Sequence, residues 1–191
     1  MISAILLAAG LSKRYKNGNK LLSKINEKEL ILISLENILK SKIKKVTIVL
    51  GKDKNKIKKI LPKSKKITVV SNPRYKNGLS SSIKYGLKHI DLDSKYFFIS
   101  LGDMPYFSHK HYNKMIQVTK KKKFNILVPV FKKTLRNPVL FEIGFADELK
   151  KINGDSGAKK IIKNFKFRRL KFDSKKIFQD FDTSANFKSI I

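Results

Sequence analysis

Short runs of β-branched and aromatic residues alternate with longer amphipathic segments along the first hundred residues. Strands are predicted where such runs have strand length, at 1–7, 45–50, 67–70 and 96–101. Helices are predicted between them at 30–42, 53–61 and 80–89. Helices that alternate with strands imply right-handed crossovers, and therefore a doubly wound, largely parallel α/β sheet.

The alternation changes after Pro105. A basic helix is predicted at 109–123, and strands at 125–130 and 137–142 are close enough to form a hairpin, which makes the sheet mixed. Two short helices at 145–152 and 156–164 and an edge strand at 166–172 complete the pattern. We therefore expect a single domain, 1–191, whose two halves are 1–105 and 106–191.

Length and composition limit the class of protein. A chain of 191 residues with 41% hydrophobic content suits one globular domain, and the lack of cysteine excludes disulfides and Cys-ligated metals. A strand-like segment begins at residue 2, which leaves no room for a signal peptide, and no apolar run is long enough to span a membrane. We therefore expect a cytoplasmic protein with no membrane partner.

The net charge of +30 suggests an anionic partner. A nucleic-acid binder would account for it, but the excess comes from lysine spread over every segment, and arginine occurs at only five positions. Abundant Lys, Asn, Ile and Phe also follow from a genome biased toward A·T. We expect no specific nucleic-acid partner, because an anionic small substrate fits the same charge.

The loop after the first predicted strand suits a polyphosphate. Ala8, Ala9 and Gly10 have little or no side chain, so a ligand can approach the backbone N–H groups. Arg14 can bind phosphate oxygens with paired hydrogen bonds, and Lys20 can act as a point charge. The loop is not a P-loop, since no Gly-Lys-Ser/Thr is present. On these residues alone, an ordinary strand-to-helix turn with solvated lysines remains an alternative.

Two further loops follow predicted strands. The segment 72–82 reads Asn-Pro-Arg-Tyr-Lys-Asn-Gly-Leu-Ser-Ser-Ser and places three hydroxyls at a helix start, where an anion or a base edge can bind. Gly102-Asp103-Met104-Pro105 comes directly after the most hydrophobic strand. Open α/β sheets bind ligands at the carboxyl ends of such strands, so Asp103 would be a natural Mg²⁺ ligand.

The second half of the chain carries two more stretches that an ordinary core does not need. One pairs Arg136-Asn137-Pro138-Val139-Leu140-Phe141 with Gly154-Asp155-Ser156-Gly157-Ala158-Lys159. The other is Asp180-Phe181-Asp182-Thr183, whose two carboxylates would share one face of an extended chain. Alternatively, Thr183 caps a helix and Asp182 is solvated.

Together, the motifs resemble one family, the nucleotidyltransferases of molybdenum cofactor maturation. The family pattern opens with L-A-A-G-x-S-x-R and K-L-L, matched here by residues 7–14 and 20–22. It continues in the same order with N-P and G-x-S-S, G-D-M-P, N-P-V-L-F, G-D-x-G-A and D-x-D-T, here at 72–73, 78–81, 102–105, 137–141, 154–158 and 180–183. The most similar branch is the molybdenum cofactor cytidylyltransferase. The guanylyltransferase branch, the molybdopterin-guanine dinucleotide synthases, has L-A-G-G where this chain has Ala9.

The resemblance implies a Rossmann-like fold of the nucleotide-diphospho-sugar transferase (GT-A-like) type, with a mixed, mostly parallel sheet flanked by helices. It also implies an Mg²⁺-dependent nucleotidyltransferase that transfers CMP from CTP to the phosphate of molybdenum-molybdopterin. The products would be molybdopterin cytosine dinucleotide and pyrophosphate. The half 1–105 would then bind the nucleotide and the half 106–191 the acceptor, and a xanthine dehydrogenase-type molybdoenzyme would receive the product.

The family's functional residues carry over to matching positions of this sequence. Catalytic roles fall on Arg14, Lys20 and Asp103; nucleotide-binding roles on Leu7, Ala8, Ala9, Gly10, Lys20, Gly78, Ser81 and Ser82; acceptor-binding roles on Asn137, Pro138, Asp155 and Gly157; and metal-binding roles on Asp103 and Asp182. The chain departs from the pattern at Arg136, where glycine is common, and at Ser184-Ala185-Asn186, where Pro-Glu-Asp is usual.

Two other functions stay open. A related nucleotidyltransferase could use the same site with GTP or with a sugar phosphate or methylerythritol phosphate as acceptor. A non-catalytic maturation protein could bind the cofactor and deliver it to a xanthine dehydrogenase-type enzyme. Lys20 and Asp103 favour an enzyme, because a carrier does not need to neutralise a leaving pyrophosphate.

Overall fold

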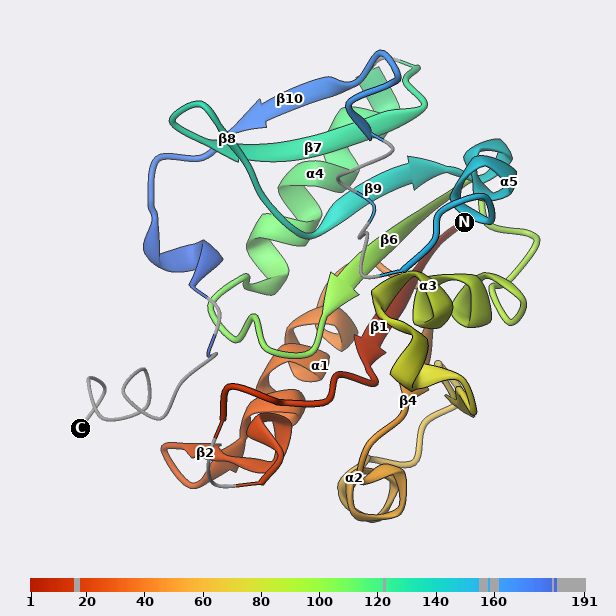
Figure 1. Ribbon diagram of the computed structural model, residues 1–191. Helices are drawn as coiled ribbons and strands as arrows, with labels where there is room; N and C mark the ends of the chain where they lie inside the picture. Colours follow the sequence, from red (N-terminus) through yellow and green to blue (C-terminus); the bar gives the residue numbers. More distant parts are fainter. Residues whose placement is uncertain (16–17, 122, 155–157, 159–161, 180, 182–191) are drawn as a thin grey trace.

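The computed structural model describes residues 1–15, 18–121, 123–154, 158, 162–179 and 181 (Figure 1). Its strands are β1 (Ile2–Ala8), β2 (Lys24–Ile25), β3 (Lys28–Glu29), β4 (Lys45–Leu50), β5 (Ile67–Ser71), β6 (Tyr96–Leu101), β7 (Ile126–Phe131), β8 (Thr134–Leu135), β9 (Val139–Glu142) and β10 (Arg168–Lys171). Its α-helices are α1 (Leu30–Leu39), α2 (Lys54–Ile60), α3 (Leu79–Leu87), α4 (His109–Lys121) and α5 (Ala146–Leu149). Within these ranges, no helix combines the length and the hydrophobicity that crossing a membrane requires.

One mixed sheet forms the centre of the molecule, in the order β10-β7-β9-β6-β1-β4-β5, with β8 paired to β7. β1 runs parallel to both of its neighbours, β4 and β6, and β5 runs parallel to β4. β9 is antiparallel to both β6 and β7, while β10 is parallel to β7. The predicted α/β fold with a mixed, mostly parallel sheet is therefore confirmed.

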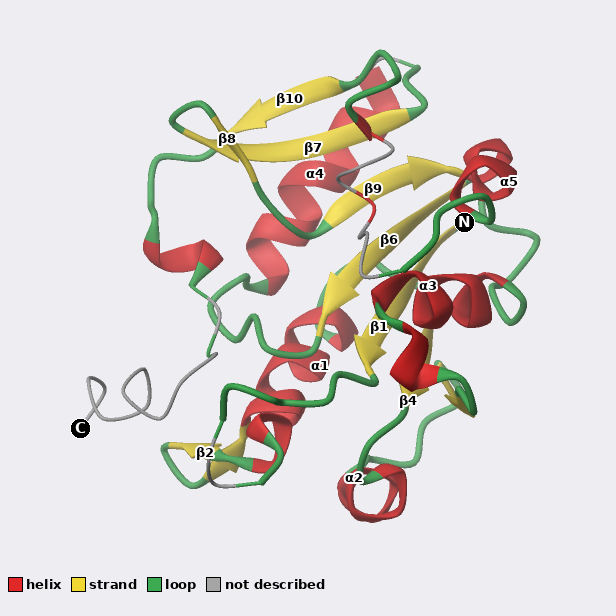
Figure 2. Ribbon diagram, in the orientation of Figure 1, coloured by secondary structure: helices red, strands yellow, loops and turns green. Residues whose placement is uncertain are grey.

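Helices cover both faces of this sheet (Figure 2). Successive side chains of a strand point to opposite faces, so the continuous apolar run of β1 contributes to two cores. Ala4 and Leu6 pack in the core that includes residues of α1 and α4, and Ile5 and Leu7 pack in the core that includes residues of α3 and α5. The central strand is thus buried on both sides, which fixes its position in the sheet.

The sequence predicted the main elements and missed several small ones, among them β8, which lies in the predicted link between two strands. The predicted helix at 145–152 is a 3₁₀ turn, η3 (Ile143–Phe145), followed by the short α5, and the predicted helix at 156–164 lies largely outside the described residues. The two-stranded ribbon β2–β3 was not predicted. Its turn residues Asn26 and Glu27 have φ values of 47° and 63°, and a strand of two residues shows no alternating pattern.

Parallel pairing brings several strand ends to one edge of the sheet. In the paired registers, Ala8 of β1 lies beside Leu50 of β4, and Leu7 lies beside Leu101 of β6. The loops that follow β1, β4 and β6 therefore begin side by side (Figure 1). Open α/β sheets bind their ligands at this edge.

Gly86 lets α3 approach the sheet closely, and Gly86→Ala should destabilise the fold. A methyl group there would lie 2.5 Å from Ile5 Cγ2 and 3.1 Å from Val49 Cγ2, on two β-branched side chains that cannot turn away freely. Overpacking of this kind costs about 1–3 kcal/mol, against a helix-propensity gain of about 1 kcal/mol. We expect urea denaturation to show a net loss of up to about 2 kcal/mol in the free energy of unfolding.

Gly10→Ala is the matched control, because a methyl group at Gly10 would meet nothing within 4 Å. Its free energy of unfolding should stay within about 0.5 kcal/mol of the parent. Equal stability of the Gly86 and Gly10 variants would contradict the close packing of α3.

Candidate active site

A cleft of about 440 Å³ opens at the carboxyl edge of the sheet. Its walls come from the loop after β1, from the segment just before and at the start of α3, and from the end of β6 with the residues that follow it. The lining residues are Leu7, Ala9, Gly10, Leu11, Ser12, Lys13, Arg14, Lys20, Leu21, Tyr75, Lys76, Gly78, Leu79, Ser82, Leu101, Gly102 and Asp103. Three motifs that are far apart in the sequence therefore meet in one cleft.

The loop after β1 presents backbone rather than side chains to the cleft. Ala9 is buried and lines the cleft together with Gly10, where a Cβ would meet no atom within 4 Å. Ala8 is also buried, but it is not among the lining residues. Small residues at this position leave room for a ligand to reach the N–H groups of the loop, as a phosphate requires.

Lys20 and Asp103 form an ion pair across the cleft. The Lys20 Nζ lies 2.5 Å from Asp103 Oδ2, and the two side chains are only 16% and 11% exposed. Lys20 begins the 3₁₀ helix η1 (Lys20–Leu22), and Asp103 follows β6. The N–H of Gly102 donates to the Leu7 carbonyl at 3.0 Å, which ties the aspartate loop to β1. The pair thus combines a cation suited to phosphate with a carboxylate suited to a divalent metal.

Further positive charge surrounds this pair. Arg14, an exposed residue, lines the same cleft, as do Lys13 and Lys76. The predicted catalytic residues Arg14, Lys20 and Asp103 therefore lie together. A cleft with four cationic side chains and one aspartate attracts a polyanion such as a triphosphate.

The loop before α3 is arranged by Asn72, which is buried. Its Nδ2 donates to Ser81 Oγ at 2.9 Å and to Ser82 Oγ at 3.1 Å, and its Oδ1 accepts from the Arg74 N–H at 2.9 Å. Gly78 and Ser82 line the cleft. Ser81 instead lines a neighbouring cleft that also includes Arg74, and its hydroxyl faces the backbone carbonyls of Arg74 and Gly78.

The predicted acceptor-binding residues are only partly described. Asn137 and Pro138, which are joined by a cis peptide bond, precede β9 and do not line the active-site cleft. Asp155, Gly157 and Asp182 lie outside the described residues. Gly154, the first residue of its motif, accepts a hydrogen bond from the Ser80 N–H at 3.2 Å, so this motif begins at the start of α3.

Sequence reasoning missed several residues of the site. Tyr75 and Lys76 line the cleft, and their signal was available because they lie inside the 72–82 motif. Gly51 was missed because it looks like an ordinary loop residue, yet a Cβ there would lie 2.7 Å from the Ala9 carbonyl oxygen and from the Tyr75 side chain. This glycine allows the first two loops of the cleft to pack against the end of β4.

Comparison with known proteins agrees with this geometry. The sequence profile of the MobA-like NTP transferase domain matches residues 4–171. The chain belongs to this family. The bifunctional protein GlmU of Clostridium kluyveri is 44% identical over 57 residues, which are 29% of this chain and 12% of that protein. The chain thus spans a small part of the length of that curated relative.

Several solved structures share the fold of this MobA-like domain. Rv0371c from Mycobacterium tuberculosis H37Rv has a TM-score of 0.85 at 20% identity, over 99% of this chain and 96% of that one, and another structure of it is a complex with manganese. The 4-diphosphocytidyl-2C-methyl-D-erythritol synthase from Anaerococcus prevotii has a TM-score of 0.77 at 16% identity, covering 100% and 94% of the two chains. Molybdopterin-guanine dinucleotide biosynthesis protein A from Archaeoglobus fulgidus has a TM-score of 0.73 at 16% identity, covering 100% and 96%.

Asp103→Asn should reduce turnover by at least about a hundredfold while the protein stays folded. The amide keeps the shape of the side chain, but it removes the charge that faces Lys20 and that a divalent cation would need. Pyrophosphate release at saturating Mg²⁺ measures the effect. Asp173→Asn changes an exposed aspartate and is the control. Turnover of the Asp103 variant close to that of the parent would show that this carboxylate has no part in the chemistry.

Lys20→Ala should impair triphosphate binding and the chemical step together. Negative charge grows on the leaving pyrophosphate, and loss of one donor to such a charge costs about 2.7–4 kcal/mol. Steady-state kinetics should therefore show kcat/KM reduced by about two to three orders of magnitude. Lys24→Ala, on the exposed start of β2, should leave the kinetics unchanged. If both variants behave alike, Lys20 is only one more solvated lysine.

Proposed function

We propose that this protein transfers CMP from CTP to the phosphate of molybdenum-molybdopterin. The products are molybdopterin cytosine dinucleotide and pyrophosphate. The observation that carries the proposal is the Lys20–Asp103 pair beside the small-residue loop after β1, in a cleft that Arg14 also lines. The family supports nucleotidyl transfer in general. The choice of CTP and of the molybdopterin acceptor rests on the motif resemblance.

The reaction forms one phosphorus–oxygen bond and breaks another. An oxygen of the acceptor phosphate attacks the α-phosphorus of CTP, and the bond from that phosphorus to the bridging oxygen of the β-phosphate breaks. Pyrophosphate leaves with the electron pair. Positioning and charge neutralisation dominate such reactions, so the chain needs cationic side chains more than an acid or a base. Lys20 and Arg14 supply charge for the triphosphate oxygens.

Asp103 fits a divalent metal. Mg²⁺ in nucleotide enzymes is commonly held by one or two carboxylates together with substrate phosphates and water. The part of the chain that the structure describes holds no cluster of three or more His, Asp or Glu side chains arranged to bind a metal. We propose that Asp103 holds Mg²⁺ with Asp182, and the manganese complex of Rv0371c supports a divalent metal in this fold. When bound, the ion neutralises charge on the phosphates.

The nucleotide base would lie between the first two loops. Leu7, Ala9, Gly78 and Ser82 line the cleft there. The Ala9 methyl group narrows the space that a glycine would leave open, which suits a pyrimidine better than a purine. Ala8 and Gly10 complete the loop, and Ser81 supports the segment before α3 through the carbonyls that it binds.

We assign acceptor binding to residues 106–191, with Asn137, Pro138, Asp155 and Gly157 as its contacts. Arg136 adds a cation directly before this motif, and its Nε is buried without a hydrogen bond to the part of the chain that the structure describes. An anionic acceptor such as a phosphate monoester would suit it. The recipient of the product would be a xanthine dehydrogenase-type molybdoenzyme.

A second candidate keeps the chemistry and changes the acceptor. The similarity in fold to the diphosphocytidyl-methylerythritol synthase supports methylerythritol phosphate as that acceptor, and a sugar phosphate is the other acceptor of this kind. Pyrophosphate release with each of the four triphosphates separates the candidates. It should be measured with molybdenum-loaded molybdopterin, with methylerythritol phosphate, with a sugar phosphate and without acceptor. Release that requires molybdopterin would support the first proposal.

CTP should be preferred over GTP by at least about a hundredfold in kcat/KM, because the wrong base leaves buried polar groups without partners. Ala9→Gly should reduce this preference by about tenfold by reopening space beside the base. Ser82 should limit the loss, since the second loop also lines the cleft. Equal use of CTP and GTP by the parent protein would refute the base assignment and leave nucleotidyl transfer standing.

A further inference from the structure

The turn after β4, residues 51–53, supports the loop after β1 from outside the cleft. Gly51 packs against the Ala9 carbonyl, and Lys52 Nζ donates to the Leu11 carbonyl at 3.3 Å. Asp53 contacts Asn19, the residue before Lys20. None of residues 51–53 is among the described residues that line the active-site cleft, and Asn19 is not among them either. Residues 51–53 therefore contact the loop after β1 without lining the cleft.

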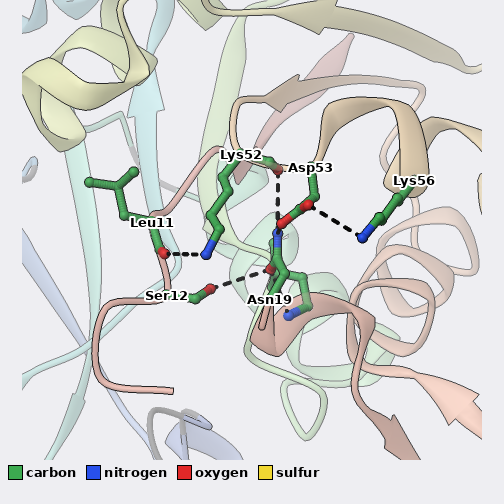
Figure 3. A network of polar contacts seen from close by, with 7 residues as sticks. Leu11, Ser12, Asn19, Lys52, Asp53 and Lys56 are labelled. Carbon is green, nitrogen blue, oxygen red and sulfur yellow. Dashed lines mark hydrogen bonds and ion pairs between the residues drawn. The ribbon is translucent and has the colours of Figure 1, made fainter. Parts of the chain in front are cut away.

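Asn19 is the centre of this support and is only 5% exposed. Its Oδ1 accepts from Ser12 Oγ at 3.3 Å and from the Leu21 N–H at 3.1 Å. Its Nδ2 donates to the Lys52 carbonyl at 3.3 Å and to Asp53 Oδ2 at 3.2 Å (Figure 3). All four hydrogen-bonding positions of the amide are thus used. The amide joins the two ends of the loop to the turn after β4.

These contacts position the backbone of Lys20 at the start of η1. The Lys20 N–H donates to Ser12 Oγ at 3.3 Å, and the same hydroxyl donates to Asn19. Asn19 is also the N-terminal cap of η1, through its bond from the Leu21 N–H. A shift of Asn19 would therefore move the start of η1, and with it the Lys20 ammonium that faces Asp103.

Asp53 has a conformation that its own helix does not explain. It is the N-cap residue of α2, but its side chain makes no capping hydrogen bond there, and its φ is 55°. Aspartate at an N-cap normally accepts from its own helix. Here the carboxylate turns to Asn19, and its other oxygen lies 3.8 Å from Lys56 Nζ. With its backbone in the left-handed conformation, Asp53 directs its carboxylate to Asn19 and not to the start of α2.

We propose that Asn19 and Asp53 are positioning residues for the triphosphate of the nucleotide. They hold Leu11, Ser12 and Lys20 in place, so that the Lys20 ammonium and the backbone N–H groups at the start of the loop face the phosphates. The proposal rests on the proposed nucleotidyl transfer, but it concerns the phosphates and not the base or the acceptor. Positioning residues of this kind affect KM and kcat more than they affect folding.

The direction of the Asn19–Asp53 hydrogen bond provides the test. Asn19→Asp would place two carboxylates about 3.2 Å apart and expel one side chain, which should move the loop. Asp53→Asn keeps an oxygen acceptor for Asn19 and should bind ligand within about threefold of the parent. In the double variant, Asn19→Asp with Asp53→Asn, the new amide at position 53 can donate to the new carboxylate at position 19. This restores one hydrogen bond with donor and acceptor exchanged. It should therefore recover part of the affinity that Asn19→Asp loses. Recovery stays incomplete because the Lys52 carbonyl, which accepts from Asn19 Nδ2 at 3.3 Å in the parent, would face a carboxylate oxygen.

Binding is measured by calorimetry in the presence of Mg²⁺. The ligands are inorganic tripolyphosphate, which carries no nucleotide base, and, in parallel, CTP and GTP. Asn19→Asp should weaken tripolyphosphate binding by about ten- to hundredfold, the range expected for an unsatisfied buried polar group. Steady-state KM should rise by a similar factor. Lys56→Ala is the matched control, because it removes the other neighbour of Asp53 and leaves the loop contacts in place.

Asp53→Ala covers the case in which Asn19→Asp does not fold. It removes the acceptor from a partly exposed side chain and should weaken tripolyphosphate binding by about tenfold. A folded Asn19→Asp or Asp53→Ala protein with the affinity of the parent would overturn the positioning role. So would a double variant that binds no better than Asn19→Asp. A parent that binds tripolyphosphate and GTP but not CTP would refute only the cytidine assignment.

Discussion

Parallel pairing of β1 with β4 on one side and β6 on the other is the constraint on which the site depends. The registers bring Ala8 beside Leu50 and Leu7 beside Leu101. The loop after β1, the turn after β4 and the loop after β6 must therefore start from adjacent points. Lys20 and Asp103 are 83 positions apart in the sequence. They meet because their loops start from neighbouring strand ends at the same edge of the sheet.

Once the strand ends are fixed, polar contacts determine the shape of the cleft. A buried amide with all its hydrogen bonds made stabilises one geometry, because any displacement leaves a donor or acceptor unsatisfied. Asn72 does this for the serines of the second loop, and Asn19 does it for the first. Two asparagines outside the walls of the cleft thus order the backbone that a ligand would meet.

The sequence was sufficient for the fold, and it selected three loops that the structure places around one cleft. The apolar runs of β1, β4, β5 and β6 are short and separated by clear helices, so their length and their β-branched and aromatic residues identify them. The loop motifs identified Arg14, Lys20 and Asp103, which share one cleft. Asn19 and Asp53 could not be found in the same way, because their role depends on a contact across 34 positions of the chain. Ser81 shows a second limit, since two adjacent serines face different clefts.

The outermost strand, β10, carries several exposed basic residues that contribute to the large net charge. β10 has β7 on one side and, within the described residues, no strand on the other. Its Arg168, Arg169 and Lys171 are exposed. An open strand edge can recruit another chain through its unpaired backbone groups, and charged side chains oppose this by repulsion and hydration. The charges on this strand therefore oppose edge-to-edge pairing with another chain, an effect that requires no anionic partner.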